Sequence, residues 1–197
     1  MQGKNTNPED QSMETLKKLE EGRSRAEQIL NQAYADVNRQ HASLEETEFH
    51  RLKIQFDIIH FQAFSAMISI LKAEPHTFAR KVALKEILHM IYEYKGTVTQ
   101  HHIWRLCQLG EYKGAYDTVT RLRELVRDFR DEFKSLDEYK TLRDKATGHY
   151  DQDISVQIAA IERIDEDAAL AHALAFAEFQ GRFAVLLREI GRATPGT

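Results

Sequence analysis

Apolar side chains recur at steps of three and four residues along most of the chain, which is the period of an amphipathic helix. The first such stripe follows a cap at Asp10 or Ser12 and should fade near His41. Its members are Leu16, Leu19, Ala26, Ile29, Leu30, Ala33 and Val37. The pattern therefore predicts a first helix with one apolar face.

Capping and stopping residues divide the rest of the chain into further helices. Ser43 with Glu46, and Ser135 with Glu138, fit the capping box in which two side chains satisfy the first free N–H groups. The other predicted caps are Thr77, Thr97 or Thr99, and Asp165 or Asp167. Predicted helix ends lie at Glu74-Pro75, Lys95-Gly96 and Gly110.

The helix predicted from Ser43 to about Lys72 is apolar on almost every face over residues 56–71. Asp57, His60 and Gln62 interrupt that run, and charges flank it closely. We interpret it as the central helix of a soluble bundle, covered by neighbours on all sides, rather than as a bilayer span.

One segment departs from the helical period. Residues Ile154 to Ile164 begin with alternating apolar and polar positions, so a short extended piece is an alternative there, although no partner strand is visible. The prediction is an all-α, antiparallel bundle of five to seven helices. It places a disordered lead-in at 1–11, one helical domain at 12–191 and a flexible tail at 192–197.

Composition supports this class and excludes others. The 42% apolar content argues against wholesale disorder, and 9 Gly with 3 Pro are too few for the turns of an all-β domain. One Cys excludes a disulfide scaffold and Cys-based zinc fingers. With no apolar run in residues 1–11, we expect no signal peptide, no membrane partner and a cytoplasmic location.

The net charge of −4 hides a basic middle. Residues 51–150 carry 17 basic and 13 acidic side chains, whereas 1–50 carry 6 and 10, and 151–197 carry 4 and 8. The basic middle contains the segment R-D-K-A-T-G-H, from Arg143 to His149. Six helical steps would put those two side chains on opposed faces, so they converge only if Gly148 ends the helix between them.

This segment resembles the R-x(4–6)-H motif of the HEPN superfamily. The longer string L-R-D-K-A-T-G-H-Y-D is similar to the signature of AbiU-type HEPN proteins, which are linked to phage abortive infection. The resemblance implies a metal-independent endoribonuclease that needs no cofactor and that works as a symmetric homodimer, with the two motifs facing each other. Gly148 departs from the family, where a residue with a side chain is common before the histidine.

The resemblance also implies roles for individual residues. His149 would act as general acid and base, Arg143 would hold the scissile phosphate, and Asp144 would support the geometry. A phage-defence or toxin–antitoxin system would supply an antitoxin or a nucleotidyltransferase-like partner. Because many HEPN domains do not cleave RNA, a non-catalytic module that binds RNA, nucleotide or protein is the alternative. In a purely structural interpretation, Arg143 pairs with a nearby acid and His149 caps a helix end.

Two further sets of residues carry possible binding chemistry. The RNA-binding candidates are Arg123, Arg127, Arg130, Lys134, Lys145 and Tyr150, although interleaved acids also fit a solvated, ion-paired helix face. Tyr112, Tyr116 and Tyr139 fit core packing better than base stacking. The pairs Asp57 with His60 and Glu86 with His89 have the carboxylate–imidazole spacing of bundle metal sites, but buried structural histidines explain them better.

Overall fold

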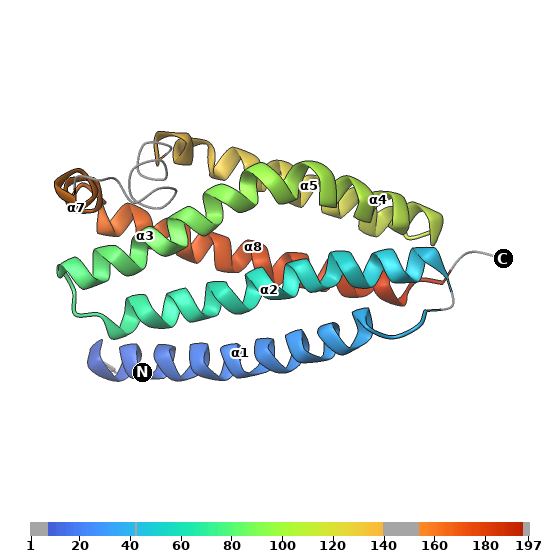
Figure 1. Ribbon diagram of the computed structural model, residues 1–197, viewed down its shortest axis with the longest axis horizontal. Helices are drawn as coiled ribbons and strands as arrows, with labels where there is room; N and C mark the ends of the chain where they lie inside the picture. Colours follow the sequence, from blue (N-terminus) through green and yellow to red (C-terminus); the bar gives the residue numbers. More distant parts are fainter. Residues whose placement is uncertain (1–7, 42, 140–153, 195–197) are drawn as a thin grey trace, which may run out of the picture.

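The computed structural model describes residues 8–41, 43–139 and 154–194, and these are almost entirely helical (Figure 1). The all-α prediction is confirmed: no strand occurs in the described residues. The elements are α1 (Pro8–Val37), α2 (Leu44–Lys72), α3 (Phe78–Glu93), the π-helical η1 (Tyr94–His102), α4 (Ile103–Tyr112), α5 (Tyr116–Glu132), the 3-10 helix η2 (Lys134–Tyr139), α7 (Ile154–Glu162) and α8 (Glu166–Arg192).

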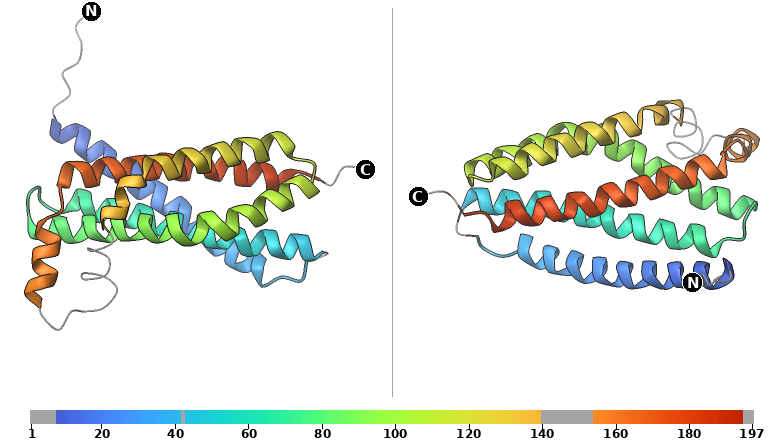
Figure 2. Two further views of the ribbon diagram at one scale, coloured as in Figure 1. Left: turned by 90° about the horizontal axis from the view of Figure 1, so that it is seen from above. Right: turned by 180° about the vertical axis from the view of Figure 1, so that it is seen from behind.

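The body of the molecule is an up-and-down bundle of long helices. Successive long elements alternate in direction: α2, then the continuous stretch from α3 through η1 to α4, then α5, and then α8 (Figures 1 and 2). Helices α5 and α8 lie side by side along the bundle. Helix α1 packs mainly against α2 and forms an outer layer. The short helices η2 and α7 both contact α3 at the end of the bundle that carries the α2–α3 turn.

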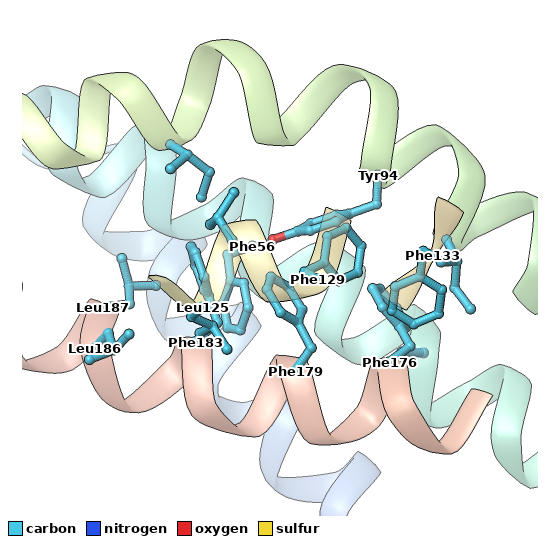
Figure 3. Close-up of a cluster of buried hydrophobic side chains, with 14 of the residues drawn as sticks. Phe56, Tyr94, Leu125, Phe129, Phe133, Phe176, Phe179, Phe183, Leu186 and Leu187 are labelled. Carbon is cyan, nitrogen blue, oxygen red and sulfur yellow. The ribbon is translucent and has the colours of Figure 1, made fainter. Parts of the chain in front are cut away.

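A cluster of aromatic rings fills the centre of the bundle (Figure 3). Tyr94 from η1 meets Phe129 from α5 and Phe176 from α8 edge-on, at centroid distances of 5.8 and 5.6 Å. Phe129 lies 4.2 Å from Phe179, and Phe56 of α2 lies 4.7 Å from Phe183. Aromatic pairs in these geometries add to the hydrophobic gain from burial, so the cluster ties these elements into one core.

Three of the predicted caps are present. Each cap residue accepts a hydrogen bond from a backbone N–H in the first turn of its helix, which satisfies a group with no partner inside the helix. The bonds run from Glu46 N to Ser43 Oγ at 3.1 Å, from Arg80 N to Thr77 Oγ1 at 3.3 Å, and from Asp167 N to Asp165 Oδ1 at 3.0 Å. The first helix begins at Pro8, ahead of both expected caps.

The predicted break at Lys95-Gly96 is wrong, because the chain stays helical from α3 through η1 into α4. A π-helix carries extra residues in each turn and so rotates the following side chains around the axis. Tyr94 reaches the core with 2% of its surface exposed, and Lys95 Nζ donates to Phe133 O at 3.0 Å. Tyr94 before Gly96 and Ile103 after it are both buried, so core contacts on both sides outweigh the local preference to stop.

The alternative of an extended piece after Ile154 and the helix start expected at Ser135 are both wrong. The alternating segment after Ile154 forms α7 rather than a strand; Ile161 and Ile164 fill the core, while Ile154 is 62% exposed. Ser135 lies within η2, a 3-10 helix in which Leu136 is fully buried. Without a neighbouring edge to pair with, an isolated extended piece leaves its backbone groups unsatisfied, whereas a helix satisfies them internally.

Helix α2 contacts α1, α3, α4 and α8, but these neighbours do not cover it all round. By length and composition, α2 and α8 are each able to cross a membrane, and in the structure both pack against other helices of the bundle. On α2, Ile58 is 40% exposed, and Ile59 and Phe61 line an open groove against α3. The expectation that neighbours enclose this helix completely is therefore wrong on that flank.

Close helix packing makes Gly110 sensitive to substitution. A Cβ atom there would lie 2.5 Å from Cγ2 of the buried Val119. We expect Gly110→Ala to destabilise the protein by about 1–2 kcal/mol, since overpacking exceeds the gain in helix propensity. The matched control is Gly181→Ala on α8, where a Cβ meets nothing within 4 Å and should stabilise by about 0.5–1 kcal/mol. Urea unfolding followed by circular dichroism measures both; equal effects would contradict the packing.

Candidate functional site

The residues of the R-D-K-A-T-G-H segment lie outside the described part of the chain. Arg143, Asp144, Lys145, His149 and Tyr150 all fall within 140–153. The elements that flank this range, η2 and α7, both pack against α3 (Figure 1). The convergence of Arg143 and His149 therefore stays a prediction.

A groove between α4 and α5 gathers the basic residues expected on one helix face. Arg123, Arg127 and Arg130 line this groove, whose volume is about 430 Å³. The groove between α2 and α3 has a volume of about 550 Å³. Steps of four and three residues place the three arginines on the same side of α5. The other lining residues are Ile103, Trp104, Cys107, Val126 and Asp131. We call this feature the α4–α5 groove.

Acidic neighbours pair with part of the positive charge around the α4–α5 groove. The pairs are Arg123 with Glu111 at 2.5 Å, Arg127 with Asp128 at 3.4 Å, and Lys134 with Asp131 at 2.7 Å. All three cations are exposed to solvent, and surface pairs of this kind contribute little stability. A guanidinium can therefore exchange its carboxylate for a phosphate oxygen at small cost.

Trp104 is the residue of the α4–α5 groove that sequence reasoning missed. It is the single Trp of the chain, and 56% of its surface is exposed. Ile103, Leu106, Cys107 and Gly110 form the buried stripe of α4, so Trp104 lies one helical step away from that stripe. That offset was the available signal, because an aromatic residue off the apolar face of an amphipathic helix points to solvent. An exposed indole beside arginines offers a stacking surface for a base.

The remaining groove and tyrosine residues divide between core and surface. Cys107 is buried as expected, and burial raises the pKa of its thiol, which leaves little reactive thiolate near neutral pH. Tyr112 and Tyr116 are 57% and 65% exposed, so the expectation that they pack in the core is wrong. Both lie where α4 turns into α5, and the turn leaves their rings without a covering helix.

The pair Asp57 and His60 is held by structural contacts. Lys53 Nζ donates to Asp57 Oδ2 at 2.5 Å, and burial raises the pKa of that carboxyl. The His60 ring stacks on Phe56 with centroids 5.5 Å apart, and burial lowers its pKa. His60 Nδ1 is buried and has no hydrogen-bond partner among the described residues. The aromatic and ionic contacts of this pair favour a structural role.

The pair Glu86 and His89 lies on the open side of α3. Both residues line the groove against α2, and Glu86 pairs with Lys85 at 2.8 Å. In the described part of the chain, the three histidine and acidic side chains that do converge closely enough to share an ion are His41, Glu46 and His50. The structure thus places its metal-like cluster at the α1–α2 turn rather than between α2 and α3.

Comparison of the chain with protein-family models, with curated proteins and with solved structures gives no match. The likeness to HEPN proteins consequently depends on the motif of residues 143–149 alone.

The partly buried imidazole of His60 should lower the free energy of unfolding in acid. Burial lowers the pKa of His60 in the folded chain below its ordinary value of 6.5. Below that pH the unfolded chain takes up a proton that the folded chain resists, so the free energy of unfolding falls as pH drops. We expect His60→Gln to make the unfolding midpoint depend less on pH between about 5 and 7. A variant with the same pH slope as the wild type would contradict the assignment.

Proposed function

We propose that this protein is a HEPN-like, RNA-binding protein and a metal-independent endoribonuclease. The observation that carries the proposal is the α4–α5 groove, where exposed arginines and Trp104 lie together. The last arginine of the groove is Arg130, and the chain runs on from α5 through η2 directly into the R-D-K-A-T-G-H segment. In the sequence, the residues of a surface suited to a nucleic-acid backbone thus precede the residues proposed to cut it.

The chemistry proposed for the motif needs no bound group. As general base, His149 takes the proton of a ribose 2′-hydroxyl, whose oxygen attacks the adjacent phosphorus. The bond from phosphorus to the 5′-oxygen breaks, and that oxygen takes a proton from water as it leaves. The products are a 2′,3′-cyclic phosphate and a 5′-hydroxyl. Arg143 donates hydrogen bonds to the phosphate oxygens as charge develops on them, and Asp144 supports the geometry. The basic content of residues 51–150 favours an anionic ligand near this segment.

The assembly and setting belong to the same proposal. Two copies would form a homodimer with their motifs facing each other, in the cytoplasm, within a phage-defence or toxin–antitoxin system. An antitoxin or nucleotidyltransferase-like protein would be the natural partner. Lys145 and Tyr150 would contact RNA next to the cut.

A second candidate function is RNA binding without cleavage. The α4–α5 groove favours it, because Trp104 and the α5 arginines supply stacking and phosphate contacts whatever the motif does. Separate assays of RNA cleavage and of RNA binding distinguish the two candidate functions.

The cleavage prediction concerns His149. We expect the purified wild type to cut RNA in the presence of EDTA and to leave 2′,3′-cyclic phosphate ends. His149→Ala should lower the rate by about 10²–10⁴-fold, the usual contribution of a general acid–base group. His101→Ala, which changes an exposed histidine of η1, is the control and should cut normally. Gel analysis and end-group mass spectrometry measure both. Equal cutting by His149→Ala and wild type would refute the catalytic role.

The binding prediction concerns Arg127. In His149→Ala protein, which should leave RNA intact, we expect Arg127→Glu to weaken binding about tenfold and to lower its salt dependence, because one phosphate contact is lost. Arg25→Glu reverses an exposed charge on the outer helix α1 and should change binding little. The emission of Trp104, the single Trp, reports binding directly. If both reversals weakened binding equally, the groove would have no special part in it.

A further inference from the structure

Three potential metal ligands converge where α1 turns into α2. His41 lies in the connection after α1, and Glu46 and His50 lie on the first turns of α2. One ligand atom from each side chain lies within 4.8 Å of the others. Glu46 and His50 are four residues apart, so the helix presents both on the same face. The ligand set is two imidazoles and one carboxylate.

The hydrogen bond of His41 leaves one of its ring nitrogens available for a metal ion. His41 Nε2 lies 2.6 Å from the backbone oxygen of Asp36. Because a carbonyl accepts only, Nε2 carries the proton, and the lone pair is on Nδ1. Metal-binding histidines commonly donate their second ring N–H to a backbone carbonyl in this way, which fixes the tautomer and the ring orientation.

His50 provides the second observation. Its Nδ1 atom is buried and finds no hydrogen-bond partner among the described residues. A buried polar atom without a partner is costly, and a bound ion would satisfy it.

The charges around the cluster favour a cation on balance. Asp36 and Glu46 supply negative charge, Arg39 pairs with Asp36 at 3.2 Å, and Lys53 is held by Asp57 at 2.5 Å. The site also lies between the negative end of the α1 dipole and the positive end of the α2 dipole, which oppose each other.

We propose that His41, Glu46 and His50 bind one Zn²⁺ ion, which clamps α1 onto α2. Zinc prefers imidazole and carboxylate ligands at about 2.0–2.2 Å, so the three donors must close by about an ångström. The His41 and His50 rings are now stacked at 4.4 Å, and rotation about their side-chain bonds would turn both nitrogens toward a shared ion. Water would complete the coordination, as in other zinc sites with three protein ligands.

The clamp would matter because α1 packs mainly against α2, whereas α2, α3, α5 and α8 each pack against several elements of the bundle. It is independent of the proposed cleavage, which needs no metal. A failed clamp and a failed nuclease are therefore separate results.

The test is titration of the chelator-stripped full chain with Zn²⁺ by calorimetry, and with Co²⁺ by its visible absorption, which reports tetrahedral nitrogen and oxygen ligands. We expect one equivalent to bind and to raise the unfolding temperature. His41→Gln, Glu46→Gln and His50→Gln should each weaken binding at least tenfold. His76→Asn, which changes a 90% exposed histidine at the α2–α3 turn, should bind as the wild type does.

If a histidine variant fails to fold, Glu46→Gln still tests the site. We expect that variant to fold, because the Glu46 side chain is exposed and its backbone N–H still donates to Ser43. No binding by the wild type would overturn the proposal. So would binding that survives all three ligand substitutions, or that falls equally in His76→Asn.

Discussion

The packing of Phe56, Tyr94, Phe129, Phe176 and Phe179 at the centre of the bundle is the constraint on which the other features depend. These rings come from α2, η1, α5 and α8, so each element is held by rings from the others (Figure 3). Tyr94 follows the buried Ile91 by three residues and so continues the buried face of α3, and the chain then stays helical through Gly96 as η1. The same continuity carries α4 onward to meet α5, and the contact between α4 and α5 creates the groove that displays Trp104 and the arginines.

The helices and caps could be predicted from the sequence because they depend on local patterns. Ser43, Thr77 and Asp165 cap helices through backbone groups a few residues away, and the apolar stripes have the helical period. The continuity through Gly96 and the helical state of 154–162 could not be predicted, because distant core contacts decide them. A local signal to stop a helix is weak beside the burial of Tyr94 and Ile161.

The candidate sites also combine features that local spacing predicts with features that only distant contacts decide. The shared face of Arg123, Arg127 and Arg130 follows from spacing within one helix. The approach of Trp104 to that face depends on how α4 packs against α5, and the meeting of His41 with Glu46 and His50 depends on the α1–α2 turn. Both are contacts between different elements, and spacing within one element does not encode them. The catalytic roles proposed for Arg143 and His149 depend only on the motif resemblance.

In the proposed function, RNA lies across the α4–α5 groove and reaches the R-D-K-A-T-G-H segment. The most direct measurement is photocrosslinking of 4-thiouridine RNA to the His149→Ala protein, followed by mass spectrometry of the linked peptides. We expect crosslinks at Trp104 and within residues 140–153, from the same bound RNA. Crosslinks concentrated on α1, or on the groove between α2 and α3, would contradict it.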